Sequence, residues 1–197
     1  MKLFWAPQTR STRAIWMLEE TGVDYELELV DIRAADRQDS REFLAASPMG
    51  KVPAIVDGDA AMSESAAICI YLADRYGKGN LAPAVDDAQR GKFLYWTLYT
   101  PAVIEPAMSE RFNKIEPNRG RSGWGDFDFM IQTFDEGLAD REWILGDRFS
   151  AADVMLGSSA VFLRMFDMLP DTKNIGHYAD RCLARPAYQK ATEVGNG

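Results

Sequence analysis

The stretch Ser47-Pro48-Met49-Gly50-Lys51-Val52-Pro53-Ala54 says most about how this chain folds. A proline that opens a β-strand, as Pro53 does here, takes the cis form in only about one X-Pro bond in twenty. In that form the N–H and C=O of Val52 are open to an extended peptide ligand, which binds by strand addition. The alternative is a proline that merely protects an edge strand. The dipeptide alone favours the second interpretation.

Upstream of this stretch, short strands and helices alternate. Residues 2–6 read as a buried strand, and residues 11–21 as a helix that Gly22 closes. Residues 25–29 alternate apolar and acidic side chains, which predicts a strand with one face in the core. A capping-box-like start at residues 39–42 predicts a short helix through residue 46.

Downstream, the sequence predicts a hairpin and a helix. Residues 52–56 and 60–62 flank Asp57-Gly58-Asp59, and Asp-Gly readily adopts positive φ. A helix over residues 64–76 follows and runs into Gly77. The first 77 residues therefore predict the order β-α-β-α-β-β-α.

The start of that last helix carries polar groups. A helix N-terminus attracts anions because its first amides are unpaired and its dipole is positive there. Ser65 is therefore a candidate donor to an α-carboxylate, and Glu64 a candidate partner for the neighbouring ammonium group. Ordinary capping by Ser63 is an equally good interpretation.

The rest of the chain reads as helical. We expect a first domain over residues 1–77, a compact linker over 78–87 and an all-helical domain over 88–197. Pro101 and Pro106 predict a kink in the first long helix. The expected helices cover residues 88–113, 127–139 and 150–166.

Composition excludes several classes of function. Thirty acidic against 22 basic residues give a net charge of −8, and no Lys/Arg run is present, which argues against nucleic acid as a partner. No signal-peptide core or membrane-spanning run is visible, so neither secretion nor membrane binding is expected. Cys69 and Cys182 form no disulfide framework, which favours the cytoplasm. His177 is the sole histidine and predicts no metal site.

Three of these motifs together resemble the glutathione site of the glutathione transferase superfamily. They are Ser47–Pro53, Asp57–Asp59 and Ser63–Ile68, and their spacing matches as well as their residues. Leu145–Asp153 is similar to the buried capping box of that superfamily, with Ser150 as cap and Asp153 three residues on. Leu183–Tyr188 resembles its closing segment, so the resemblance covers nearly the whole chain.

Two further segments bear on the subclass. Arg13–Glu20 and Ile104–Ala107 look most like bacterial and fungal theta-like transferases or a yeast membrane-associated type. The resemblance as a whole implies a thioredoxin-like α/β N-terminal domain followed by an all-α C-terminal domain.

The resemblance also implies a set of glutathione contacts. Val52, ahead of Pro53, would bond the cysteinyl backbone, and Glu64 and Ser65 would hold the γ-glutamyl end. Lys51 would lie near the glycine carboxylate, although a solvated surface lysine is an alternative for it.

The loop before the first helix has to supply the group that activates the thiol. Trp5 aligns with the tyrosine of the tyrosine classes and Arg10 with the cysteine of the beta class, so neither mechanism is available. Ser11 and Thr9 remain as hydroxyl donors, with Arg10 or Arg13 adding positive potential. A hydrogen bond to a charged partner contributes about 1.5–3 kcal/mol, so one donor lowers the thiol pKa by roughly one to two units. Ser11 is preferred as the expected N-cap, but it also fits a purely capping role.

Tyr95, Trp96 and Tyr99 are candidates for an apolar pocket for a second substrate, although aromatic residues at this spacing also fit a helical core.

The expected function is a homodimeric enzyme that conjugates glutathione to small hydrophobic electrophiles, or uses it to reduce peroxides, without a metal or prosthetic group. The alternatives are a non-catalytic binding or interaction protein and a thiol oxidoreductase that depends on Cys69 or Cys182.

Overall fold

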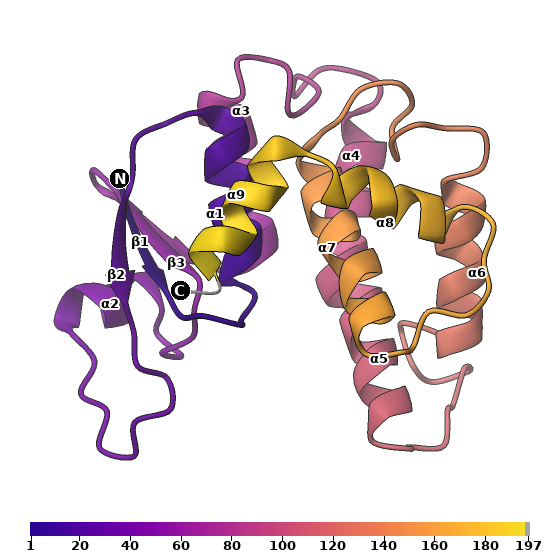
Figure 1. Ribbon diagram of the computed structural model, residues 1–197, viewed down its shortest axis with the longest axis horizontal. Helices are drawn as coiled ribbons and strands as arrows, with labels where there is room; N and C mark the ends of the chain where they lie inside the picture. Colours follow the sequence, from indigo (N-terminus) through magenta and orange to yellow (C-terminus); the bar gives the residue numbers. More distant parts are fainter. Residues whose placement is uncertain (196–197) are drawn as a thin grey trace. The chain divides into compact units, whose positions relative to one another are not determined.

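The computed structural model describes residues 1–195, which form two compact units (Figure 1). The first contains Met1–Lys78 and the described residues from Arg185 onward, and the second contains Gly79–Ala184. Each unit is described by itself below.

The first unit contains the expected element order. It is made of β1 (Lys2–Trp5), α1 (Ser11–Thr21), β2 (Glu26–Leu29), α2 (Arg41–Ala46), β3 (Ala54–Asp57), β4 (Ala60–Ser63), α3 (Ser65–Tyr76) and α9 (Pro186–Gly195). The thioredoxin-like α/β prediction for this part of the chain is confirmed.

The strands form one mixed sheet in the order β2-β1-β3-β4. β1 runs parallel to β2 and antiparallel to β3, and β3 and β4 form the predicted hairpin around Gly58, whose φ is +61°. In the register, Ala54 lies opposite Phe4 on one side and Ser63 on the other. The end of β1, the start of β3 and the end of β4 therefore meet at one edge of the sheet.

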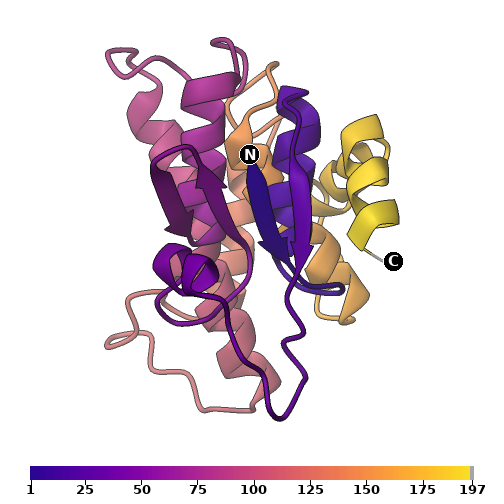
Figure 2. The same cartoon turned by 90° about the vertical axis from the view of Figure 1, so that its left-hand side faces the viewer.

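Helices cover both faces of the sheet (Figure 2). Phe4 packs with Phe43 of α2 on one face, with ring centroids 5.2 Å apart, and Val30, Ala46 and Ala54 complete this cluster. Leu3 and Ile55 are fully buried and pair in the register, so alternation directs them to the opposite face, where α1 and α3 pack together.

The outer strand β2 departs from the sequence prediction. Leu27 and Leu29 were expected to face the core, but they are 39% and 62% exposed. β2 is an edge strand with a neighbouring strand on one side only, so its side chains are less covered than those of the central strands. The alternating pattern predicted the strand correctly and its burial wrongly.

The last helix packs on the first helix of the chain. α9 lies against α1, where the Trp16 and Tyr188 rings meet edge to face at 4.8 Å. Arg185 Nε and Nη2 donate to the two carboxylate oxygens of Glu20 at 2.6 and 2.7 Å. The sequence predicts one helical domain over residues 88–197, whereas this final segment groups with the first unit.

The second unit is helical, as predicted. It comprises α4 (Arg90–Tyr99), a π-helix η1 (Thr100–Ile104), α5 (Glu105–Phe112), α6 (Phe127–Gly137), α7 (Ala151–Met165) and α8 (Ile175–Leu183). Instead of one helix over residues 88–113, the π-helix joins two shorter α-helices, with the Glu105 N–H donating to Thr100 O. Pro101 lies in this turn, where its missing N–H disrupts the regular α-helical ladder.

The predicted capping box at the start of α7 is confirmed. Ser150 N–H and Oγ lie 2.9 Å from Asp153 Oδ2, and Ile144 N–H and Tyr178 OH each donate to Oδ1 at 2.9 Å. Burial raises the Asp153 pKa to about 6, against the effect of these donors.

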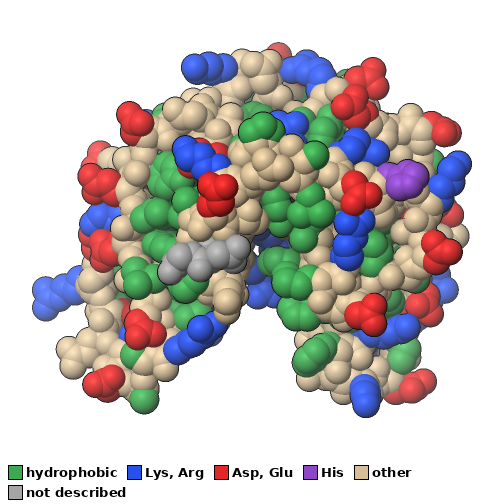
Figure 3. Space-filling model, in the orientation of Figure 1, with side chains coloured by type: hydrophobic (Ala, Val, Ile, Leu, Met, Phe, Trp, Pro, Cys, Tyr) green, Lys and Arg blue, Asp and Glu red, His purple; other side chains and the backbone are tan. Residues whose placement is uncertain are grey.

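On the face shown in Figure 3, Lys and Arg side chains are interspersed with Asp and Glu. Among residues 1–195, no helix is long and apolar enough to cross a membrane.

Candidate functional site

The turn before β3 is held by its own side chains. Ser47 Oγ accepts from Lys51 N–H at 2.9 Å and donates to Lys51 O at 2.8 Å. Gly50 in this turn has a φ of +61°, and the Val52–Pro53 peptide bond is cis. The paired register of β3 begins only at Ala54, so Val52 lies just outside the ladder.

Arg37, in the loop between β2 and α2, stabilises this turn. Arg37 Nη2 donates to Gly50 O at 3.0 Å and to Asp39 Oδ2 at 2.7 Å. A Cβ added at Gly50 would lie 2.8 Å from that nitrogen, which belongs to the far end of a flexible side chain, so the positive φ is the main reason for glycine here. The sequence does not predict this role of Arg37, because nothing in the pattern indicates which backbone carbonyl a loop arginine reaches.

The end of β4 leads into α3 through an unusual backbone. Glu64 has φ +75° and ψ 116°, a conformation that side-chain-bearing residues rarely adopt, and strain of this kind concentrates at functional sites. α3 begins at Ser65, which is 7% exposed, whereas the sequence predicted a start at Glu64. Ser63 is the last residue of β4, so the structure does not favour the Ser63 cap. Glu64 is exposed.

The third segment is the loop between β1 and α1. Thr9 Oγ1 accepts from Ser11 N–H at 3.1 Å and lies 2.9 Å from Ser11 Oγ and 2.7 Å from Ala6 O. Ser11 Oγ in turn accepts from Ala6 N–H at 3.3 Å. The two candidate hydroxyls are therefore directly coupled.

The placement of Ser11 differs from the expectation. Arg10 occupies the N-cap position and Ser11 is the first helical residue, fully buried. Thr9 is half-buried. The sequence could not show this, because the burial depends on how the loop folds back on Ala6.

The two arginines expected to add positive potential have different surroundings. Arg10 is exposed, whereas Arg13 is 2% exposed and lies close enough to Cys69 to oppose the rise of its pKa. Lys51 is exposed, in keeping with either interpretation given for it.

These three segments meet at one edge of the sheet. Phe4, Ala54 and Ser63 share one line of the register, so the chain leaves β1, enters β3 and leaves β4 at neighbouring positions. An extended peptide on this edge has a strand-entry backbone, a helix N-terminus and a hydroxyl pair within one unit.

The three aromatic candidates in the second unit are not equivalent. Trp96 and Tyr99 are 9% and 5% exposed, whereas Tyr95 is 51% exposed. Trp96 packs against Gly137, where an added Cβ would lie 2.5 Å from its ring, and Tyr99 OH donates to Met130 O at 3.2 Å. The structure thus leaves Tyr95 accessible to a ligand and places the other two in the helical core.

Both cysteines are buried. Desolvation raises the Cys69 pKa to about 12, and Cys182 is 0% exposed. A thiol of this kind is a poor nucleophile, because the thiolate is the reactive form.

Known proteins resemble nearly the whole chain. Residues 9–75 match the family described as "Glutathione S-transferase, N-terminal domain". Glutathione S-transferase hmp2 of Hypomyces subiculosus is 30% identical, covering 92% of this chain and 93% of its own, and glutathione S-transferase GstA of Escherichia coli O157:H7 is 28% identical, covering 97% and 96%. A structure described as a ternary complex of BphK, a bacterial GST, superposes with a TM-score of 0.83 at 25% identity and full coverage of both chains.

Proposed function

The chain belongs to the glutathione S-transferase family, and we propose that it binds glutathione at the sheet edge and transfers its thiolate to a small hydrophobic electrophile. The observation that carries this proposal is the register that brings Phe4, Ala54 and Ser63 into line.

Glutathione in the proposed complex extends along the start of β3. Val52, held next to cis-Pro53 and outside the ladder, pairs with the cysteinyl backbone of the tripeptide. Ser65 and the first amides of α3 donate to the γ-glutamyl carboxylate, and Glu64 pairs with the ammonium group of that residue. Lys51 is the candidate partner of the glycine carboxylate.

The hydroxyl pair stabilises the thiolate in this scheme. The Thr9 hydroxyl has one proton, which is available to Ala6 O, to Ser11 Oγ or to an incoming sulfur, while Thr9 Oγ1 accepts from the Ser11 N–H. Because Ser11 is buried and Thr9 is half-buried, we assign direct contact to Thr9 and a supporting role to Ser11.

The chemistry is a nucleophilic substitution by the substrate thiol. The thiol proton passes to solvent, the sulfur forms a bond with the electrophilic carbon, and the leaving group departs with its electron pair. Of the three aromatic candidates, Tyr95 is the exposed one, at 51%. Peroxide reduction, in which the same thiolate attacks oxygen, is a second reaction open to this site.

Protein-thiol chemistry is disfavoured, because both cysteines are buried and the Cys69 pKa is raised to about 12. We also propose that the protein acts in the cytoplasm as a homodimer, the arrangement typical of the family.

Calorimetry with millimolar glutathione, followed by an assay with 1-chloro-2,4-dinitrobenzene, tests the proposed function. Heat of binding and formation of the conjugate are expected. Absence of both heat and a shift in melting temperature would favour a non-catalytic interaction protein instead.

A further inference from the structure

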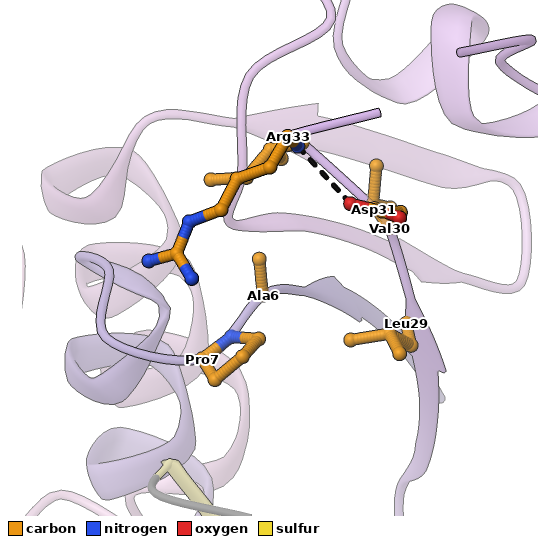
Figure 4. A pocket seen from close by; sticks show the side chains of 7 residues that line it. Ala6, Pro7, Leu29, Val30, Asp31 and Arg33 are labelled. Carbon is orange, nitrogen blue, oxygen red and sulfur yellow. Dashed lines mark hydrogen bonds between the residues drawn. The ribbon is translucent and has the colours of Figure 1, made fainter. Parts of the chain in front are cut away.

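A hollow of about 260 Å³ lies within the first unit, where β1 and β2 end (Figure 4). β1 and β2 are parallel, with Trp5 opposite Leu29, so their carboxyl ends meet at the same place. Its lining residues are Ala6, Pro7, Leu29, Val30, Asp31, Ile32 and Arg33.

The floor of this hollow is apolar and exposed. Leu29 is 62% exposed and Ile32 is 37% exposed. Covering such side chains is favourable at about 25 cal/mol for each Å² removed from water. Pockets for drug-sized ligands have volumes of about 300–1,000 Å³, so a hollow of 260 Å³ suits a molecule with a single ring.

The rim of the hollow carries one cation and one anion with different surroundings. The Asp31 carboxylate accepts from the Arg33 backbone N–H at 3.1 Å, so it is engaged within its own loop. The guanidinium of Arg33 extends on the side of Pro7, as Figure 4 shows, with Nη2 3.4 Å from Gln8 Oε1. Its remaining N–H groups are available to a planar anion, which a guanidinium binds in a bidentate manner.

The wall of the hollow is part of the loop that carries the hydroxyl pair. The carbonyl of Ala6 accepts from Thr9, and the Ala6 N–H donates to Ser11. A ligand in the hollow therefore lies against the segment to which we assign thiol activation.

We propose that this hollow binds the second substrate, and that this substrate is a single-ring apolar electrophile bearing a carboxylate that pairs with Arg33. Only the identification of the ligand as the second substrate rests on the proposed function. Binding of a carboxylate-bearing ring in the hollow does not depend on it. In a reaction with 4-(chloromethyl)benzoate, the sulfur–carbon bond forms as the carbon–chlorine bond breaks and chloride leaves with the electron pair.

Binding without reaction tests the hollow alone. In NMR titrations without glutathione, 4-methylbenzoate is expected to bind more tightly than 4-methylbenzamide, its neutral counterpart. Arg33→Gln should weaken binding of the benzoate by about three- to tenfold and leave the amide unchanged. Arg41→Gln, at an exposed arginine of α2, is the matched control and should bind both as the original protein does. Equal benzoate affinity in the Arg33 and Arg41 variants would overturn the proposal.

A second pair of variants tests the apolar floor. Leu29→Glu places a negative charge in the hollow and should abolish benzoate binding, whereas Leu27→Glu, at an exposed leucine of the same strand outside the lining, should not. Loss of binding in both variants, with unchanged melting temperatures, would contradict this location.

An assay of conjugation then distinguishes the proposed hollow from the proposed transferase activity. Arg33→Gln should raise KM for 4-(chloromethyl)benzoate by about three- to tenfold at unchanged kcat, with no effect on benzyl chloride. Turnover of both compounds without this split would reject the hollow and keep the transferase. Charge-selective binding of methylbenzoate with no turnover of either compound would reject the transferase and keep the hollow.

Discussion

Ser65 occupies the first position of α3 and is 7% exposed, directly after the strained Glu64. If its hydroxyl and the helix amides hold the γ-glutamyl carboxylate, Ser65→Ala removes a hydrogen bond to a charged group. Such bonds contribute about 1.5–3 kcal/mol, so glutathione should bind about ten to a hundred times more weakly. Calorimetry measures this, with Ser63→Ala as the control. Unchanged affinity in Ser65→Ala would refute the γ-glutamyl assignment.

The buried cysteines give a second prediction at the scale of single residues. Because the Cys69 thiol has a pKa of about 12 and Cys182 is inaccessible, iodoacetamide at pH 8 should leave both unmodified in the native protein. Mass spectrometry should find both alkylated in denaturant. Rapid modification of the native protein, with loss of activity, would restore the protein-thiol interpretation.

Asp153, at the start of α7, predicts how the stability of this element depends on pH. Its pKa is about 6 in the folded protein and about 3.9 in an unfolded chain, so the folded state binds the proton more tightly. Its contribution is therefore complete below about pH 4 and declines as the pH rises through 6, by up to about 3 kcal/mol.

Urea unfolding of the original protein and of Asp153→Asn across pH 4–7 measures this contribution. The asparagine variant lacks the titration, so the free energy of unfolding of the original protein should fall relative to the variant as pH rises. A constant difference between the two would contradict the burial-driven shift.

At the level of elements, the hydrophobic pattern predicted the strands and helices within residues 1–77 well, because each has a clear period and clear ends, but it did not predict α9. The pattern failed where the burial of a residue depends on which elements pack nearby. Leu27 and Leu29 have the alternation of a half-buried strand but lie on an uncovered edge. The cap of α2 is Ser40, which accepts from Phe43 N–H at 3.1 Å, one residue later than expected.

The same distinction between local pattern and tertiary packing applies to the candidate site. Val52, Glu64 and Ser65 could be proposed from motifs, because the local backbone requirements of a strand entry and a helix start are visible in sequence. The burial of Ser11 and the Arg37 contact with Gly50 could not, since both depend on a loop folding over distant residues.

At the scale of the whole chain, its last helix stabilises the unit formed by its first residues. Arg185 makes a bidentate ion pair with Glu20, whose side chain is 9% exposed. Arg185→Ala should lower the free energy of unfolding of this unit by about 1–3 kcal/mol, because a largely buried carboxylate loses its charged partner and keeps the Trp16 Nε1–H donor at 2.9 Å.

Arg164→Ala is the matched control. Arg164 pairs with Asp180 at 2.7 Å, but the two side chains are 40% and 63% exposed, so its loss should cost at most about 1 kcal/mol. Thermal unfolding compares the two variants. Equal destabilisation would show that the Arg185–Glu20 pair contributes no more to stability than an exposed ion pair.

The pKa of bound glutathione tests the central claim most directly. Thiolate ultraviolet absorbance, followed against pH in the saturated protein, should give a thiol pKa roughly one to two units below about 8.5. Thr9→Val should return the pKa toward that value, and Thr21→Val, at the far end of α1, should not. A bound thiol that titrates as in free solution, or a pKa that Thr9→Val leaves unchanged, would contradict the account.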